Sequence, residues 1–210
     1  MNKYNKKITK PFVVAVTGGI ASGKTSVCEL FQELFKIETI DTDILAKEAV
    51  SSGSNCLNEI VSVFGERVVD ETRNLNRQLM RKIIFKNSNL RKKLESIVHP
   101  EVRRLIDSNL SRINSKYCLL GIPLLHQKNQ DARIDRVLVV DCEEQLQIQR
   151  ATVRDNLEKK DIERIISSQA TREKRLALAD DVITNRGTLN ELKDKIIELH
   201  ELYCDLSAQK

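Results

Sequence analysis

Short apolar runs alternate along the chain with longer stretches in which apolar residues recur every three or four positions. The short runs, FVVAV and RVLVV among them, are almost continuously apolar, which is typical of strands buried on both faces of a parallel sheet. The longer stretches have one apolar face and predict helices. The alternation predicts an α/β fold, a five-stranded parallel sheet covered by helices in three α/β/α layers.

The short runs place the predicted strands at 12–17, 37–41, 117–122, 136–141 and 181–184. Helices are expected at 24–35, directly after Asp43, and at 189–206.

Two long stretches lie between the strands. The stretch 54–115 is helical in pattern throughout, too long for a simple crossover, and predicts an inserted helical subdomain. His99-Pro100 is expected to divide it, because a proline pushes the preceding residue out of the helical region and itself suits a first helical turn. A second helical stretch, 143–179, separates the last two strands.

Composition excludes several classes. The 210 residues, 40% hydrophobic and 31% charged, are typical of a soluble globular domain. Aromatic residues make up only 4%, with no Trp, which argues against a stacking surface for single-stranded nucleic acid.

No apolar run approaches the roughly 20 residues of a membrane helix, and the one after the basic N-terminus is too short for a signal peptide. The five cysteines show no CxxC or metal-ligand spacing, so we expect free thiols and a cytoplasmic protein.

The strongest chemical signal is a glycine-rich loop between the first predicted strand and the first predicted helix. It matches G-x-x-x-x-G-K-[ST], whose backbone N–H groups surround phosphates at a helix N-terminus. In this motif the lysine reaches the β- and γ-phosphates of ATP and the Ser/Thr hydroxyl ligates Mg²⁺. The residues are Gly18, Gly19, Ile20, Ala21, Ser22, Gly23, Lys24 and Thr25.

Two carboxylates, Asp41 and Asp43, follow the second predicted strand. Ligands of open α/β sheets bind beyond the carboxyl ends of the strands, so one acid can orient or deprotonate an acceptor hydroxyl while the other holds the metal's water shell. We assign the base to Asp43, and the alternative is that it only caps the next helix. Asp141 ends the fourth predicted strand. It is either a metal ligand or an ordinary residue at the end of a strand.

Basic residues recur in both helical stretches. Arg150 and Arg154 share a helix face and are candidates for stabilising transition-state charge from a mobile lid, or form a solvated face paired with Asp155 or Glu158. Ten Arg or Lys residues but only two acids lie between Arg73 and Arg104. This excess would attract an anionic acceptor, or is a solvated surface.

These motifs together resemble the dephospho-coenzyme A kinase family over residues 12–203. The segments that carry the resemblance occur in order: VTGGIASGKTS, IDTD, LNRQLMRKIIF, LESIVHPEV, IPLL, RVLVVD and QATREKRLALADDVITNRG. The phosphate loop by itself is common to many nucleotide-binding proteins, whereas the later segments in this order are much more specific. The resemblance implies transfer of the ATP γ-phosphoryl to the ribose 3′-hydroxyl of dephospho-coenzyme A, a small-molecule acceptor.

The resemblance also implies that different segments of the chain have different roles. It predicts a nucleotide core (11–42, 117–142 and 180–206), an acceptor-binding insert (43–116) and a lid (143–179). It implies that Gly18 to Ser26 bind the ATP phosphates and that Asn185 and Gly187 lie near adenine. The residues expected at the acceptor are Asp43, Arg77, His99 and Arg154, and those expected in catalysis are Asp43, Lys24 and Arg150.

Two positions depart from the family pattern. Ala21 stands where a third glycine is common, at a variable position of the loop motif, so the loop is still expected to close. His126-Gln127 stand where an apolar residue and a glutamate usually follow IPLL. If that glutamate holds the metal or the acceptor, its loss would slow the reaction; a glutamine still forms hydrogen bonds, so an active enzyme is expected.

Two other classes compete with this interpretation. A shikimate-type or nucleoside monophosphate kinase also places carboxylates after the second strand, but the long basic insert and the ADDVI…N…G segment disfavour it. A nucleotide-dependent switch or nucleic-acid-binding ATPase is disfavoured by the scarcity of aromatics and the absence of an N-K-x-D motif. The sequence gives no indication of oligomeric state.

Overall fold

The computed structural model describes residues 10–85, 87–125, 127 and 131–210. The chain divides into two compact units. The sheet unit comprises the chain up to Asp41 together with Ile113–Lys210, and the helical unit comprises Thr42–Arg112. The chain passes from one unit to the other after Asp41 and returns after Arg112.

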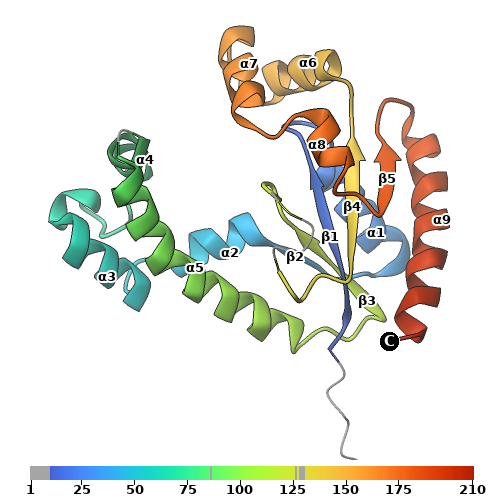
Figure 1. Ribbon diagram of the computed structural model, residues 1–210, viewed down its shortest axis with the longest axis horizontal. Coiled ribbons are helices and arrows are strands. Elements are labelled where there is room, and N and C mark those ends of the chain that lie inside the picture. Colours follow the sequence, from blue (N-terminus) through green and yellow to red (C-terminus); the bar gives the residue numbers. More distant parts are fainter. Residues whose placement is uncertain (1–9, 86, 126, 128–130) are drawn as a thin grey trace, which may run out of the picture. The chain divides into compact units, whose positions relative to one another are not determined.

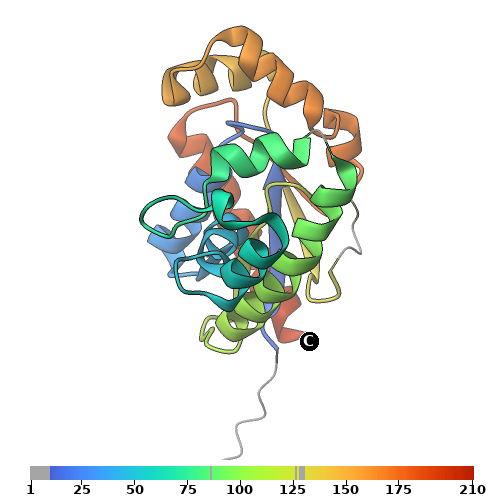
Figure 2. The same ribbon diagram turned by 90° about the vertical axis from the view of Figure 1, so that its left-hand side faces the viewer.

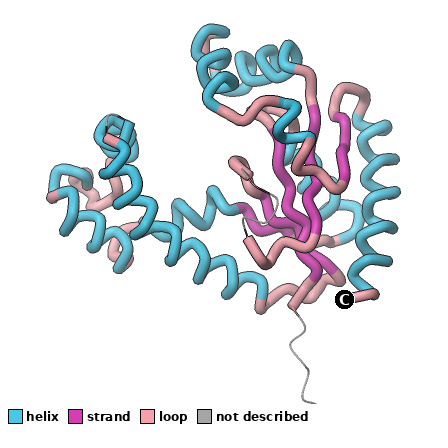
Figure 3. The backbone as a smooth tube through the Cα atoms, viewed as in Figure 1, coloured by secondary structure: helices cyan, strands magenta, loops and turns pink. Residues whose placement is uncertain are grey.

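The sheet unit is built on five parallel strands in the order β2-β3-β1-β4-β5, as predicted (Figure 1). Figure 3 shows the strands side by side in magenta. Their bounds are β1 Phe12–Gly18, β2 Thr39–Asp41, β3 Tyr117–Gly121, β4 Arg136–Asp141 and β5 Asp181–Thr184.

One strand starts later than predicted. The strand expected at 37–41 begins at Thr39, because the chain is still leaving the preceding helix: Lys36 has a φ of 58° and the N–H of Ile37 donates to the carbonyl of Phe31. The other four strands lie within one residue of their predicted bounds.

Apolar residues of β1 and β4 point alternately to the two faces of the sheet, because successive side chains of a strand do so. Val14 and Val16 pack into the core cluster that contains residues of α1 (Lys24–Phe35) and α9 (Leu189–Ala208). Ala15 packs into the opposite cluster, where Leu176 covers it. Both faces are therefore buried, which explains the continuous apolar runs.

The predicted helical stretch 143–179 forms three helices, α6 Glu144–Asp155, α7 Lys159–Ser168 and α8 Arg172–Leu176. Helices α6 and α7 contact each other and lie beyond the carboxyl ends of the strands (Figures 1 and 2). Helix α8 packs on β4, so it returns the chain to the sheet before β5.

The helical unit holds α2 Thr42–Ala49, α3 Asn55–Phe64, α4 Arg77–Phe85 and α5 Ser88–Leu110, with one 3₁₀ turn at Glu66–Val68. It has its own apolar core. Within its described residues the β structure is one isolated bridge between Val69 and Leu75, in agreement with the prediction of a helical insert.

The expectation that His99-Pro100 divides this stretch is wrong, because α5 runs unbroken from Ser88 to Leu110. A proline inside a helix costs about 3 kcal/mol, since it lacks the N–H that would bond the carbonyl four residues back. Here Ser96 and Pro100 are both exposed, so water can reach that carbonyl.

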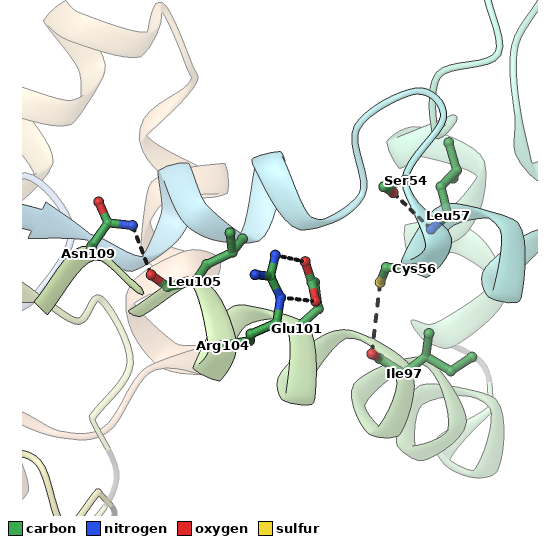
Figure 4. A network of polar contacts seen from close by, with 8 residues as sticks. All are labelled: Ser54, Cys56, Leu57, Ile97, Glu101, Arg104, Leu105 and Asn109. Carbon is green, nitrogen blue, oxygen red and sulfur yellow. Dashed lines mark hydrogen bonds and ion pairs between the residues drawn. The ribbon is translucent and has the colours of Figure 1, made fainter. Parts of the chain in front are cut away.

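Helix α5 buries apolar side chains on both sides of the proline. Ile97 lies before it and Leu105 after it, and each is less than 10% exposed. Burial of one such side chain contributes about 1.5–3 kcal/mol, so the packing offsets the cost of the proline. Figure 4 shows the contacts along this helix, with the thiol of Cys56 donating to the carbonyl of Ile97 and Arg104 paired with Glu101.

Candidate functional site

The glycine-rich loop joins the central strand β1 to helix α1, in the strand–loop–helix context that the motif requires. Gly23 precedes α1 with a φ of 96°, a conformation that favours glycine. Lys24 is the first residue of α1, and Thr25 and Ser26 are exposed in its first turn. The loop therefore presents the N-terminus of α1 at the carboxyl end of the sheet, where α/β proteins bind phosphates.

Ala21 adopts a φ of 51°, in the left-handed region. Such a conformation favours glycine, because a left-handed residue with a Cβ costs roughly 1–2 kcal/mol. The loop closes in spite of this cost. Ser22 donates its backbone N–H to the carbonyl of Gly19 at 3.3 Å, and Val27 donates to that of Gly23 at 3.0 Å.

The first two glycines of the loop lie against other parts of the sheet unit. A Cβ on Gly18 would lie 2.5 Å from the carbonyl oxygen of Val140 on β4. A Cβ on Gly19 would lie 2.5 Å from Oε1 of Gln147. The backbone carbonyl cannot move aside, so the position of Gly18 requires glycine for space, whereas a side chain at position 19 would displace the end of Gln147.

Lys24 folds over the beginning of the loop. Its Nζ donates to the carbonyl oxygens of Gly18 and Gly19, each at 2.9 Å. The ammonium group is thus held at the end of the loop where β1 finishes.

Side chains that follow β4 and β5 brace the loop from outside. Nδ2 of Asn185 donates to the carbonyl of Ser22 at 2.8 Å, and the guanidinium of Arg150 donates to the carbonyl of Asn185 at 3.1 Å. The structure therefore brings together three predicted site residues, from the loop, from α6 and from the segment after β5.

The segment before α8 and α8 itself supply two loop contacts that the sequence did not identify. Oε1 of Gln169 accepts the backbone N–H of Ile20 at 3.1 Å. A guanidinium nitrogen of Arg175 would lie 3.1 Å from a Cβ on Gly19. By composition alone residues 167–172 resemble a helix junction, and only the return of α8 to the sheet brings Gln169 and Arg175 to the loop.

Asp141, at the end of β4, lies directly beside the loop, because β4 pairs with β1 and Val140 is in register with Gly18. Its carboxylate is mostly buried and accepts two hydrogen bonds from Arg172, at 2.8 and 2.6 Å. These bonds hold the pKa of Asp141 below its ordinary value. Asp141 is therefore an ionised partner of Arg172.

Two more predicted residues of the sheet unit, Arg154 and Gly187, are exposed. Arg154 pairs with its neighbour Asp155, in agreement with the solvated alternative. Gly187 provides room for the carboxylate of Glu191, which accepts the backbone N–H of Thr188 in the capping box of α9.

Three further predicted residues belong to the helical unit, and each is exposed. Asp43 lies in the first turn of α2, whereas the position before that helix is occupied by Asp41. Arg77 begins α4, and His99 lies within α5. Two residues after IPLL, His126 and Gln127, depart from the family pattern. Gln127 is exposed, and His126 lies outside the described residues.

Helix α4 has a hollow of about 410 Å³ beside it, lined among the described residues by Arg81, Lys82, Ile83 and Phe85. The side chain of Phe85 is 91% exposed, which is unusual for a large apolar residue. Arg77, Arg81 and Lys82 have no carboxylate at ion-pair distance among the described residues, so this helix carries an uncompensated positive charge.

No helix in the described part of the chain is long and apolar enough to cross a membrane.

The sequence profile of the dephospho-CoA kinase family matches residues 12–191. Curated relatives named dephospho-CoA kinase include those of Vibrio parahaemolyticus, 42% identical over 91% of this chain and 94% of the relative, and of Thiobacillus denitrificans, 40% identical over 95% and 98%. A crystal structure from Thermus thermophilus has a TM-score of 0.81 at 31% identity and covers 92% of this chain and 99% of its own.

More distant structures share the fold. A dephospho-CoA kinase from Campylobacter jejuni has a TM-score of 0.65 at 23% identity and covers 90% of this chain and 95% of its own. A shikimate kinase from Bacteroides thetaiotaomicron has a TM-score of 0.54 at 12% identity and covers 91% and 97%. Together, the family match, the curated relatives and the phosphate loop on the central strand establish that the chain belongs to the dephospho-CoA kinase family, which phosphorylates dephospho-CoA with ATP in the last step of coenzyme A biosynthesis.

Proposed function

We propose that this chain transfers the γ-phosphoryl group of ATP to the ribose 3′-hydroxyl of dephospho-CoA, with Lys24 and Asp43 as the main catalytic residues. The observation that carries the assignment is the closed phosphate loop at the end of β1, with the ammonium of Lys24 fixed at its start. The backbone N–H groups of the loop and the N-terminus of α1 bind the phosphates. Lys24 then stabilises the charge that develops on the β- and γ-phosphates.

Mg²⁺ fits the donors beside the loop. It binds through one or two protein oxygens, together with phosphate oxygens and water, rather than in an all-protein cage. The described residues contain no cluster of three His, Cys, Asp or Glu side chains that would form such a cage, whereas the exposed hydroxyl of Thr25 and the exposed carboxylate of Asp41 are suitable single ligands. When bound, the ion neutralises charge on the phosphates.

Asp43 follows β2 by two residues, beyond the carboxyl end of that strand, and its carboxylate is exposed. In the proposed step Asp43 accepts the proton of the 3′-hydroxyl as that oxygen bonds to the γ-phosphorus. The bond from the γ-phosphorus to the bridging oxygen breaks, and ADP leaves.

The positive charge of α4 supports binding of the acceptor through its pyrophosphate. Arg77, Arg81 and Lys82 have no acidic partner among the described residues, and the exposed ring of Phe85 beside them suits the less polar arm of the acceptor. His99 is proposed as a further acceptor contact of the same unit.

Arg150 and Arg154 are proposed to act from the lid, with Arg150 on transition-state charge and Arg154 on the acceptor. Asn185 and Gly187, in the loop after β5, are proposed to lie near adenine. The hydrogen bonds from Arg150 to Asn185 and from Asn185 to Ser22 support a common role for this group at the nucleotide.

Paired substitutions test the proposed roles. Lys24→Ala is expected to lower kcat by roughly 10²–10³-fold or more, because a charge-stabilising group is lost. Asp43→Asn is expected to reduce kcat as severely while ATP affinity, measured by calorimetry, stays within a few-fold of the wild type. Near-normal turnover of the Lys24 variant, or lost ATP affinity with a high residual rate in the Asp43 variant, would contradict these roles.

A further inference from the structure

The arginines around the phosphate loop differ in what neutralises them. Several pair with a carboxylate: Arg154 with Asp155, Arg164 with Asp161, Arg172 with Asp141 and Arg186 with Glu143. Arg175 has no carboxylate at ion-pair distance in the described part of the chain. Its guanidinium donates a hydrogen bond to the carbonyl oxygen of Ala170, a neutral acceptor.

The guanidinium of Arg175 is fixed in direction. Arg175 belongs to α8, and the next residue, Leu176, packs into the core cluster that covers Ala15 of β1. The helix is capped by Thr171, whose hydroxyl accepts the backbone N–H of Lys174. The bond to Ala170 then directs the guanidinium back toward the loop, where one of its nitrogens would lie 3.1 Å from a Cβ on Gly19.

A half-buried cation with no carboxylate at ion-pair distance is costly, because burial removes part of its hydration. Burial lowers the pKa of Arg175 from its ordinary value in spite of the opposing charges of Asp141 and Glu173, but an arginine remains charged at neutral pH. An anionic ligand would remove this cost, whereas a neutral surface would not.

Lys24 and Arg175 approach the same short segment of the loop. Nζ of Lys24 donates to the carbonyl of Gly19, and the Arg175 guanidinium lies beside the Cα of the same residue. Because a phosphate-loop lysine contacts the β- and γ-phosphates, a second cation at Gly19 lies near the terminal end of the triphosphate.

We infer that Arg175 is a further catalytic residue, which contacts the γ-phosphoryl group of ATP and stabilises the charge that develops on it during transfer. The guanidinium can bind two phosphate oxygens in parallel, which a lysine cannot. This inference rests on the proposed role of the loop as the ATP site.

The test compares ATP with ADP, which differ in the γ-phosphate. Arg175→Gln is expected to weaken ATP binding by at least tenfold in calorimetry and ADP binding by less than threefold. Its kcat is expected to fall by roughly 10²-fold or more. Arg175→Lys, which keeps the charge, is expected to recover part of the ATP affinity but less of kcat.

Arg164→Gln is the matched control, because Arg164 is exposed on α7 and pairs with Asp161 in the same helix. It is expected to leave both affinities and kcat unchanged.

Equal weakening of ATP and ADP by Arg175→Gln would mean that Arg175 only supports the fold of the loop, and unchanged binding and kcat would mean that it touches no phosphate. Either result overturns the inference. If Arg175→Gln does not fold, Arg175→Lys decides in the same way. The inference then requires that this variant lose more affinity for ATP than for ADP. Lys24→Ala separates the two hypotheses, since it abolishes transfer if the loop is the ATP site, whatever the role of Arg175.

Discussion

Replacement of Gly23 by alanine tests how the loop is held by the segment after β5. Gly23 has a φ of 96°, and a Cβ built on it would lie 2.0 Å from Nδ2 of Asn185. That nitrogen donates to the carbonyl of Ser22 at 2.8 Å. Gly23→Ala therefore imposes a strained backbone and also displaces the side chain that braces the loop.

The two costs can be separated. A left-handed alanine costs roughly 1–2 kcal/mol, and the lower entropy of the unfolded alanine chain returns about 0.4–1 kcal/mol. Loss of the hydrogen bond to a buried carbonyl adds about 1–3 kcal/mol. We expect Gly23→Ala to lower the free energy of unfolding by roughly 2–4 kcal/mol, and ATP affinity to fall with it.

Gly53→Ala is the matched control, because Gly53 has a φ of 80° and nothing within 4 Å of a Cβ built on it. Gly53→Ala introduces the backbone strain alone. It is therefore expected to lower the free energy of unfolding by about 0.5–1 kcal/mol and to leave ATP binding unchanged. Urea unfolding followed by circular dichroism gives the stabilities, and calorimetry gives the ATP affinities. Combining Gly23→Ala with Asn185→Ala removes the clash, so the added cost of Gly23→Ala is expected to shrink toward that of Gly53→Ala.

Equal costs for the two glycine variants, together with wild-type ATP affinity in Gly23→Ala, would refute the argument. The contact between Asn185 and the loop would then be incidental, and the glycine would serve the backbone conformation only.

Arg77→Gln is expected to raise the KM for dephospho-CoA several-fold and to leave the KM for ATP unchanged, with Glu66→Gln as a surface control in the same unit. An equal rise in both KM values would contradict an acceptor role of Arg77. The lowered pKa of Asp141 predicts a pH effect, because a carboxylate with a depressed pKa stabilises the fold above the ordinary Asp pKa of about 4 and loses this contribution as the pH falls through the lower native value. The wild type is therefore expected to lose more stability than Asp141→Asn as the pH falls from 5 toward 3 in urea titrations, and parallel losses would show that the Arg172 pair contributes nothing.

Much of the fold could be predicted from the sequence, because its signals are local. Continuous apolar runs mark strands that are buried on both faces, and those of β1 and β4 had to be central for that reason. The loop motif carries its own requirements, since Gly23 must take a positive φ and Lys24 must begin a helix. The assignment of particular helical stretches to acceptor binding and to a lid stays a prediction.

The prediction failed at Pro100, where a local rule competed with packing. The residue pair His99-Pro100 favours a break, but burial of Ile97 and Leu105 on either side of the proline keeps α5 continuous. Local propensity is worth a few kcal/mol at most, so several buried contacts outweigh it.

Which residues surround the loop was decided by tertiary structure alone. Arg172 and Arg175 are three residues apart in a basic segment, and nothing in their spacing distinguishes them. The strand order places β4 beside β1, so Asp141 pairs with Arg172, while Arg175 reaches Gly19 without a carboxylate at ion-pair distance among the described residues. The sequence determined where phosphate is expected to bind, because the motif lies in consecutive residues. The side chains that complete the site come from segments more than a hundred residues away, and only their packing on the sheet brings them together.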